Sequence, residues 1–483
     1  MTGKATKHLS VTNDIILRIG SIADEVGVEA YVVGGYVRDQ LFKKINYTGA
    51  AADDGEMKDI DIVVIGDGIS FANTTASKMG KKQIIIYEKF GTAMLQLDDR
   101  KVEFVTAREE HYEPTSRKPK VKKASLQSDL SRRDFTINAL AVAINEKHLG
   151  EIVDPFDGED DIRKKILRTP LDPEQTFDDD PLRMMRAIRF ASQFRFHIEE
   201  RTLEAIRKKA SRITIVSVER TTDEFLKILA TPTPSIGIKL LLELGLTKFI
   251  FPELDEMVGV QQRKDYHHKD VFLHTMKVID NICDETDNLW LRFTALVHDI
   301  AKPRTKAFVE RVGWTFHGHD DLGARMMQSI FRRMKLPMDK LPYVEKLIRL
   351  HLRPMVLVSE EITDSAVRRL LFEAGGAIDD LVMLCRADIT SQNPERVTKY
   401  LKNYEVVLAK MKEVEEKDRL RNWQPPIRGN EIMDVCNIQP GPLVGVLKKK
   451  IEEAILDGLI PNEHEAALVY LLSIKNKVLQ EHS

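Results

Sequence analysis

The first 150 residues alternate short apolar runs with polar turns, a pattern typical of a mixed α/β fold. Apolar residues recur near a 3.6-residue period over 11–27 and predict a helix. The apolar run at 30–33 leads into Gly34-Gly35 and a further amphipathic stretch, so we expect a strand, a turn and a helix. Further strands are expected at 59–65, 83–87, 93–97 and 102–106.

Helical periodicity dominates beyond residue 160, where strand signals nearly vanish. Proline-containing breaks at 231–234, 252, 303 and 425–426 separate the predicted helices. The segment 43–58 is small, polar and unpatterned, and is expected to be a flexible loop. The sequence therefore predicts an α/β N-terminal part followed by all-α regions.

Composition narrows the class of protein. The chain has 483 residues, which at about 150 per domain suggests roughly three domains. With 43% hydrophobic and 31% charged residues, it is neither collagen-like nor wholly disordered. A net charge of -2 excludes a uniformly basic coat, but residues 181–212 hold seven Arg and two Lys against three Glu. A local basic surface that follows RNA or nucleotide phosphates remains open.

Three widely spaced cysteines, Cys283, Cys385 and Cys436, do not suggest a disulfide framework and fit a reducing compartment. No apolar run reaches the 18 or so residues that span a bilayer, and the N-terminus lacks an apolar signal core. We therefore expect a cytoplasmic protein without a membrane segment.

Two carboxylates are spaced for one face of a predicted strand. Asp59 and Asp61 alternate with apolar residues, so both project to the same side. Like charges at this spacing repel unless a cation lies between them. A divalent metal held by such a pair suits nucleotidyl transfer, whereas the simpler interpretation is two solvent-facing acids on an edge strand.

Other residues add to this candidate site. Gly34-Gly35 before a helix suits close approach of an anion, or is a simple turn. Arg38 is placed to meet a triphosphate, with Asp39 orienting it or complementing the helix dipole. Glu103, on a later strand, would complete a carboxylate triad or is a surface acid.

GGYVRDQLF, DIDIVV and the segment SRRDFTINA (131–139) together resemble the class II tRNA nucleotidyltransferase and bacterial poly(A) polymerase family. The resemblance implies a polymerase β-like head in which Asp59, Asp61 and Glu103 are catalytic and the two aspartates hold Mg²⁺. It also implies that Gly34, Gly35 and Arg38 bind the triphosphate, and that Arg133 and Asp134 contact the ribose.

The segment DDDPLRMMRAIRF (178–190) resembles the neck motif of the same family. It implies that Asp180 and Arg183, three apart on one helix face, present acceptors and donors to the incoming base, with Arg186 also binding the nucleotide. Asp180 before Pro181 is equally a good helix N-cap. The closing neck motif, with Glu219, Glu224 and Lys227 among its residues, is expected to be a structural helix with ion pairs.

The C-terminal half carries a second possible metal site. The order His274, His298-Asp299 and Asp388 resembles the HD phosphohydrolase superfamily. The resemblance implies a divalent transition metal of unknown identity on these residues, and His319 and His351 would bring a second one. Lys302 follows His298 by four residues and would bind a phosphate oxygen. The alternative is a set of packed core histidines.

The resemblance also implies a domain order. We predict a catalytic head (1–152), a base-recognising neck (153–230), a connector (231–262), an HD-type domain (263–390) and a tRNA-binding tail (391–483). The tail holds Pro440-Gly441-Pro442 before a helix with lysines at 448–450.

The implied activity is two-metal, template-independent transfer of CMP and AMP from CTP and ATP to the tRNA 3′ end, forming CCA. Three alternatives stay open. The enzyme would add only A or only C to tRNA, or be a poly(A) polymerase. In the third, HD-type phosphohydrolysis is the main activity and the head binds RNA.

Overall fold

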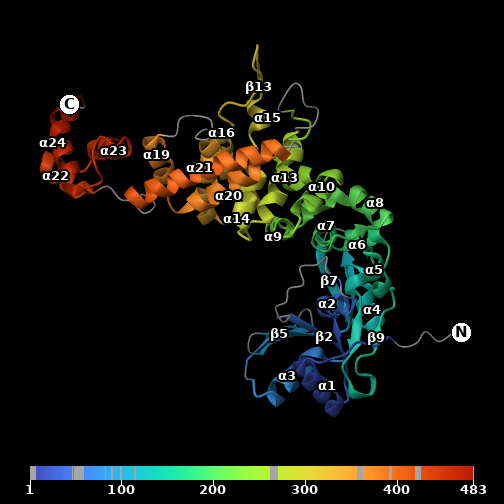
Figure 1. Ribbon diagram of the computed structural model, residues 1–483. Coiled ribbons are helices and arrows are strands. Elements are labelled where there is room, and N and C mark those ends of the chain that lie inside the picture. The colour runs from blue at the N-terminus through green and yellow to red at the C-terminus, as the bar shows by residue number, and fades with distance from the viewer. Residues whose placement is uncertain are drawn as a thin grey trace. The chain divides into compact units, whose positions relative to one another are not determined.

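The computed structural model describes residues 7–45, 47, 59–81, 83–88, 91–97, 100–113, 116–261, 270–355, 363–390, 394–418 and 426–481. Most of the expected loop at 43–58 lies outside the described residues. The chain forms two compact units, Met1–Asp255 and Glu256–Ser483 (Figure 1). The finer division into five parts stays a prediction.

Unit 1 is built on a seven-stranded sheet in the order β3-β4-β5-β2-β1-β8-β9. Only β2 and β5 are parallel neighbours, and the other pairs are antiparallel. The mixed α/β head is thus confirmed. The strands are β1 (Glu29–Val33), β2 (Asp59–Ile65), β3 (Ile84–Tyr87), β4 (Thr92–Leu97), β5 (Arg100–Thr106), β8 (Ala141–Ala143) and β9 (Ile152–Val153).

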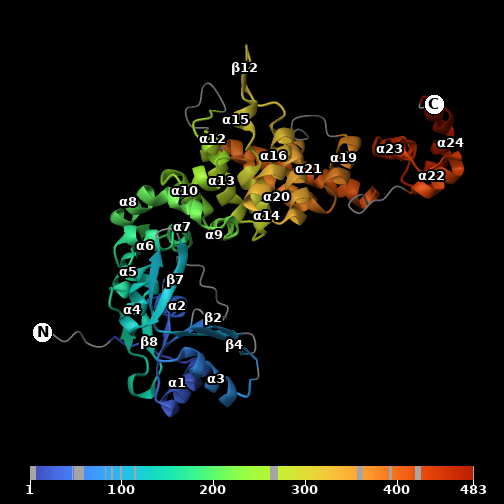
Figure 2. The same cartoon turned by 180° about the vertical axis from the view of Figure 1, so that it is seen from behind.

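Helices α1 (Asp14–Val26) and α3 (Gly68–Lys78) lie together at this sheet (Figures 1 and 2). The Asn13 side chain accepts the first free N–H groups of α1, and Gly27 ends the helix in the left-handed region. On α3, Phe71 packs edge-on against Phe104 of β5, with ring centroids 5.7 Å apart. This contact identifies the apolar face of the sheet.

A hairpin of β6 (Arg108–Glu113) and β7 (Ser116–Lys123) was not expected from the sequence. The segment is rich in charged residues and contains Pro119, so it carries no apolar alternation. Its strands pair through the main chain, which hydrophobic periodicity does not detect. The predicted helical remainder is confirmed, and it contains two further short strand pairs: β10 (Ile166–Leu167) with β11 (His197–Ile198), and β12 (Ala307–Val309) with β13 (Gly313–Thr315).

Helices follow the sheet in unit 1, and α7 packs against α9 and α10. The rings of Phe190 and Phe194 on α7 are stacked, with centroids 5.4 Å apart, and Phe194 meets Phe42 of α2. This aromatic contact joins α7 to α2. The helices are α2 (Gly35–Lys44), α4 (Leu126–Ser131), α5 (Gly158–Lys164), α6 (Pro173–Asp179), α7 (Leu182–Phe194), α8 (Glu200–Lys209), α9 (Val218–Leu229), α10 (Pro234–Glu243), α11 (Thr247–Ile250) and α12 (Glu253–Glu256), which crosses the unit boundary.

Among the described residues of unit 2, the regular structure is helical apart from the β12–β13 hairpin. Buried Leu291, Leu381 and Tyr404 belong to one apolar core, and Leu447 and Leu471 belong to a second core in the tail. The first set of helices is α13 (Val271–Cys283), α14 (Leu289–Val297), α15 (Lys302–Thr305), α16 (His319–Met334), α17 (Leu341–Leu350), α19 (Asp364–Ala374), α20 (Ile378–Asp388) and α21 (Pro394–Asp418). The last helices are α22 (Gly429–Cys436), α23 (Pro442–Leu456) and α24 (His464–Glu481). None of the described helices is long and apolar enough to cross a bilayer.

Candidate active site and metal centre

The structure brings the three head carboxylates to one face of the sheet. Asp61 of β2 is directly opposite Glu103 of β5 in the parallel pairing, and Asp59 precedes Asp61 by two residues on the same strand. Paired and alternate residues project to the same side, which is opposite to the side of Phe104. The predicted grouping of Asp59, Asp61 and Glu103 on one surface is therefore present.

Electrostatics at these carboxylates favour a cation. Burial raises the pKa of Asp61, Arg133 lowers it, and the neighbouring Asp59 raises it again. Burial raises the pKa of Glu103, as does the charge of Asp61. Three carboxylates that repel one another suit a hard divalent ion. They are not one tight cluster, because the groups of three or more ligand atoms within 4.8 Å found among the described residues lie in unit 2.

The glycine turn lies against this carboxylate face. Gly34 has a φ of 70°, in the left-handed region. A Cβ atom on Gly34 would be 3.5 Å from Asp61 Oδ2 and 3.1 Å from Arg133 Nη1. Three motifs that are far apart in the sequence thus meet at one point, beside the N-terminus of α2.

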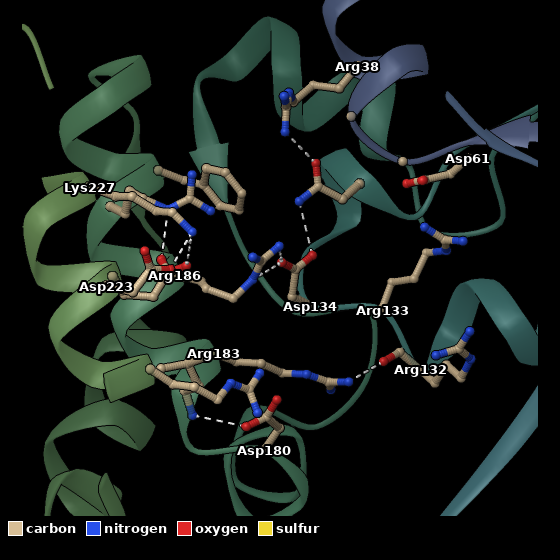
Figure 3. Close-up of a pocket in the computed structure, with 18 residues that line it drawn as sticks. Arg38, Asp61, Arg132, Arg133, Asp134, Asp180, Arg183, Arg186, Asp223 and Lys227 are labelled. Carbon is tan, nitrogen blue, oxygen red and sulfur yellow. Dashed lines mark hydrogen bonds and ion pairs between the residues drawn. The ribbon is translucent and has the colours of Figure 1, made fainter. Parts of the chain in front are cut away.

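A polar pocket of about 650 Å³ extends from this point. Figure 3 shows Asp61 and Arg133 on one side and Lys227 on the other, with Asp134 and Arg186 between. Arginines dominate its lining, as an anionic ligand requires. The expected site residues on its wall are Gly34, Gly35, Arg38, Asp61, Arg133, Asp134, Asp180, Arg183 and Arg186.

Asp134 is buried within a network at the centre of the pocket. Its Oδ2 accepts from Arg186 Nε (2.8 Å) and Nη2 (2.6 Å), and its Oδ1 accepts from Asn138 Nδ2 (3.0 Å). Burial would raise the pKa of Asp134, but Arg186 and Asn138 outweigh it and lower the pKa to about 2. Asp134 is therefore ionised and fixes the direction of Arg186.

Arg133 keeps a donor free beside the carboxylates. Its Nη2 contacts Asp129 Oδ2 at 3.2 Å, and its buried Nε has no hydrogen-bond partner. Asp129 is fully buried and also accepts from Arg132. Burial raises the pKa of Asp129, but the two arginines outweigh burial, so the pKa lies below its ordinary value. A half-buried guanidinium with an unused N–H is suited to an anionic ligand.

Arg38 is held from several sides. Its Nε donates to Asp39 (2.7 Å), as the sequence suggested, and its Nη1 donates to Asn138 Oδ1 (2.8 Å). The guanidinium also lies 4.8 Å from the centroid of the Phe194 ring. These contacts fix a positive charge one turn along α2 from the glycines.

Asp180 corrects one sequence expectation. It is not on a helix face with Arg183, because it lies in extended backbone between α6 and α7. Its Oδ1 accepts from Leu182 N at 3.2 Å, which is the capping role weighed as the alternative. Arg183 Nη2 donates to the Arg132 carbonyl at 2.5 Å. Both side chains nevertheless line the pocket.

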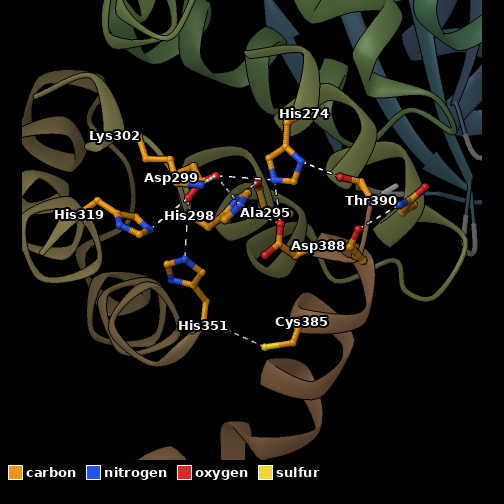
Figure 4. Close-up of polar contacts among 12 residues, drawn as sticks. His274, Ala295, His298, Asp299, Lys302, His319, His351, Cys385, Asp388 and Thr390 are labelled. Atoms are coloured by element: carbon orange, nitrogen blue, oxygen red, sulfur yellow. Dashed lines mark hydrogen bonds and ion pairs between the residues drawn. The ribbon is translucent and has the colours of Figure 1, made fainter. Parts of the chain in front are cut away.

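A second group of polar side chains is buried in unit 2 (Figure 4). His274 Nε2 lies 2.8 Å from Asp388 Oδ1, and His298 Nε2 lies 3.4 Å from the same oxygen. His319 Nε2 lies 3.4 Å from Asp299 Oδ1. Five elements supply these residues: α13, the end of α14, the start of α16, the end of α17 and α20.

Hydrogen bonds fix the imidazoles in one tautomer. The Nδ1 atoms of His298, His319 and His351 donate to backbone carbonyls at 2.8, 2.7 and 2.6 Å. Their Nε2 atoms are buried and have no hydrogen-bond partner. An imidazole held through Nδ1–H with a lone pair free on Nε2 is the arrangement of a metal ligand.

The ligand atoms fall into two groups, each within 4.8 Å: His274, His298 and Asp388, and then Asp299, His319 and His351. Burial lowers the pKa of His298, but the carboxylates of Asp299 and Asp388 outweigh it and raise the pKa to about 10. Without a metal, the two carboxylates therefore hold a proton on His298 Nε2, and a metal ion bound there would displace this proton and supply the positive charge. The donor set fits divalent transition metals.

Lys302 differs from its sequence expectation. The α14 helix ends at Val297, so the four-residue spacing from His298 does not place Lys302 on a shared helix face. Lys302 instead starts α15, and its Nζ contacts Asp299 Oδ2 at 2.6 Å.

Comparison with known proteins agrees with this geometry. Residues 30–168 match the poly A polymerase head domain. Residues 195–258 match the probable RNA and SrmB-binding site of polymerase A, and residues 266–374 match the HD domain. An A-adding tRNA nucleotidyltransferase of Deinococcus radiodurans is 32% identical over 71% of this chain and 78% of its own length.

The chain belongs to the class II tRNA nucleotidyltransferase and poly(A) polymerase family. It is therefore a nucleotidyltransferase by family. A CC-adding tRNA nucleotidyltransferase of Thermus thermophilus is 28% identical, with 91% of this chain and 92% of the relative covered. The fold is that of a solved CCA-adding enzyme, with a TM-score of 0.63 at 23% identity over 96% of both chains.

Sequence analysis did not predict part of the pocket wall. Arg189 Nε donates to buried Glu224 Oε2 at 2.8 Å, and Lys227 Nζ pairs with Asp223 on the preceding turn of α9. The ion pairs expected for this helix are present, but their place in the pocket was not foreseen. The spacing of Arg189, three residues beyond Arg186, was a signal that α7 presents a row of arginines.

Proposed function

We propose that this protein adds CMP and AMP from CTP and ATP to the 3′ end of tRNA, without a nucleic-acid template. The observation that carries the proposal is that Asp61, paired with Glu103 across β2 and β5, lies against the glycine turn in an arginine-lined pocket. We infer that the RNA substrate is tRNA because the relatives include A-adding and CC-adding tRNA nucleotidyltransferases.

The reaction joins the primer 3′-oxygen to the α-phosphorus of the nucleotide. The bond between the α-phosphorus and its bridging oxygen to the β-phosphate breaks, and pyrophosphate leaves. Asp59 and Asp61 would hold Mg²⁺, which supplies positive charge for the phosphates and lowers the pKa of the attacking hydroxyl. Glu103, whose carboxyl pKa is raised by burial and by Asp61, stands ready to take up the hydroxyl proton.

The chain's own cations bind the nucleotide. Arg133 offers its unpaired Nε–H to a phosphate or the ribose, and Arg38 adds a fixed charge beside Gly34 and Gly35. Asp134 acts by orienting Arg186. These contacts hold sugar and phosphates in the same place for either base.

Base choice falls to Asp180 and Arg183. The guanidinium offers two parallel donors and the carboxylate offers acceptors, so together they can match the edge of cytosine or adenine. Arg186, held by Asp134, is a further donor toward the same space. The proposal includes a cytoplasmic location, in keeping with free Cys283, Cys385 and Cys436.

The test offers purified protein three tRNA primers: one that lacks CCA, one that ends in CC and one that is complete. Each is incubated with labelled CTP, ATP, GTP or UTP, singly and together. Ordered addition that stops after CCA supports the proposal. Addition of A alone, addition of C alone or growth of a homopolymer identifies one of the alternatives and contradicts CCA synthesis.

We propose hydrolysis of phosphate esters in unit 2 as a second function. The buried Nε2 atoms of His298, His319 and His351, which all face Asp299 or Asp388, favour it. His274, His298 and Asp388 would hold one divalent metal ion, and Asp299, His319 and His351 a second. Such ions lower the pKa of a bound water. Hydrolysis of bis-p-nitrophenyl phosphate should be lost in His298→Ala/Asp299→Ala and retained in Asp59→Asn/Asp61→Asn.

A further inference from the structure

The carboxylate face of the head sheet continues past Glu103 to the edge of the sheet. In the antiparallel pairing of β4 with β5, Met94 lies opposite Glu103. In the pairing of β3 with β4, Ile85 lies opposite Met94. Because paired residues project to the same side, Asp61, Glu103, Met94 and Ile85 form one row across four strands.

A second row runs beside the first. Thr92 pairs with Val105, and Tyr87 pairs with Thr92. Tyr87 is therefore the neighbour of Ile85 on the carboxylate side. The intervening residue Ile86 pairs with Ala93, which pairs with Phe104, and Phe104 contacts Phe71 of α3. Ile86 thus belongs to the opposite face.

This apolar edge is open to solvent. Ile85 is 50% exposed and Tyr87 is 47% exposed, and Met94 is half-buried beside them. An edge strand with exposed apolar side chains is an aggregation hazard that proteins usually prevent with charge. An apolar patch retained at such an edge, continuous with a polar reaction site, indicates a binding surface.

The position of this patch limits what it can bind. Strands lie about 4.8 Å apart, so Ile85 is about 10 Å from Glu103, the length of two to three stacked bases. Exposed Lys101 is on the same face, opposite Asp59 in one pairing and Gln96 in the other, and adds positive charge. An RNA strand whose 3′-oxygen reaches the carboxylates would extend over these residues.

We infer that Ile85, Tyr87 and Met94 form a platform on which the last bases of the RNA primer stack, with Lys101 facing its backbone. The inference rests on the proposed function and adds a primer site to it. Stacking on aromatic and aliphatic side chains tolerates any base. That property suits an enzyme whose primer ends first in tRNA sequence and then in newly added nucleotides.

The test compares two faces of one strand. Tyr87→Ala and Ile85→Ser remove the platform, whereas Ile86→Ser makes the matched change on the α3 side. With tRNA ending in CC as primer, we expect the first two variants to raise KM for tRNA about tenfold, since one base stack contributes about 1–3 kcal/mol. Their KM for ATP and the KM values of Ile86→Ser should stay close to those of the wild type.

A crosslink locates the primer directly. A tRNA primer with 5-iodocytidine at its penultimate position is irradiated with the full-length protein, and the crosslinked peptide is sequenced. We expect the label on the peptide that contains 84–87, and its loss in Tyr87→Ala. Equal KM effects of Ile85→Ser and Ile86→Ser, or a crosslink confined to other peptides, would overturn the platform.

The same series separates this inference from the proposed function. If the wild type adds no nucleotide to tRNA, the proposed function fails. If the wild type is active and Tyr87→Ala keeps wild-type KM for tRNA, only the platform fails. A change of oligomeric state in Tyr87→Ala without a change in KM would assign the edge to pairing between chains and contradict the platform.

Discussion

Glu103 lies directly opposite Asp61 in the parallel pairing of β5 with β2, so a carboxylate from far along the chain joins the Asp59–Asp61 face. We predict that Glu103→Gln lowers kcat for nucleotide addition about a hundredfold or more, because it removes a group able to take up the hydroxyl proton. KM for ATP should change little. Steady-state incorporation into tRNA ending in CC measures both.

Glu29 supplies a control for that variant. It is an exposed glutamate at the start of β1, where it pairs with Ile65, four residues along β2 from Asp61. Glu29→Gln should retain wild-type kcat. Wild-type kcat in Glu103→Gln would mean that Glu103 is only a surface acid.

We predict that nucleotide incorporation requires glycine at position 34, beyond the requirement of the turn for a left-handed residue. A side chain at φ 70° is strained, and in Gly34→Ala the new Cβ would also crowd Arg133 Nη1 and contact Asp61. Gly27 is the matched control, because its φ is 69° and a Cβ there meets nothing within 4 Å. Both alanine variants should lose about 1 kcal/mol of unfolding free energy. Only Gly34→Ala should also lose most of its nucleotide incorporation; equal activity in the two variants would contradict close packing at the site.

Asp180 and Arg183 are predicted to set base choice. Arg183→Ala should reduce the preference for ATP and CTP over GTP and UTP by about 10- to 100-fold, since a paired donor contact gives about 1–3 kcal/mol of discrimination. Asp180→Ala should act similarly and also lose a helix cap. Competition between labelled nucleotides measures the preference.

Asp172 separates the two roles of Asp180. It caps α6 through the N–H of Gln175, and it is not among the pocket residues. Asp172→Ala should lower stability by about 1 kcal/mol and keep full base preference. If Asp172→Ala and Asp180→Ala changed selectivity equally, capping alone would explain Asp180.

The Asp134–Arg186 pair should make stability depend on pH. The folded pKa of Asp134, about 2, is below its ordinary value of 3.8, so its contribution is present above pH 4 and is lost as pH falls toward 2. We expect Asp134→Asn to unfold with about 2 kcal/mol less free energy at pH 7. The gap to wild type should shrink by about 1 kcal/mol between pH 5 and pH 3. Urea titrations at each pH test this, and a constant gap would contradict ionic pairing.

The buried histidines of unit 2 are predicted to bind metal in two places. Wild-type protein should hold two divalent ions per chain, and His319→Ala/His351→Ala should hold one. His317→Ala is the control, because this histidine is exposed and outside both groups. Elemental analysis after dialysis gives the stoichiometry. Equal metal content in all three proteins would indicate packed core histidines.

Local patterns predicted the head well. The alternation of Asp59 and Asp61 with isoleucines placed both acids on one strand face, and the glycine pair marked the turn before α2. The histidines and aspartates of unit 2 were found as one set because the order of His274, His298-Asp299 and Asp388 along the chain resembles that of the HD superfamily. The signal in the head was local, and the signal in unit 2 was the order of residues over a long segment.

Relationships that depend on tertiary packing were not predictable. Asp180 was assigned to a helix because three-residue spacing is shared by helices and by the caps that precede them. The β6–β7 hairpin pairs through main-chain groups without apolar alternation. The row from Asp61 to Ile85 exists only in the sheet register, which brings four separate strands into line.

The most direct test of the central claim measures Mg²⁺-dependent addition of labelled CMP and AMP to tRNA that lacks CCA. The wild type is compared with the conservative variants Asp59→Asn and Asp61→Asn after each variant has been shown to be folded like the wild type. The account predicts addition that requires Mg²⁺ in the wild type and a loss of at least a hundredfold in each variant. Undiminished addition by both variants would contradict a catalytic role for the carboxylate face.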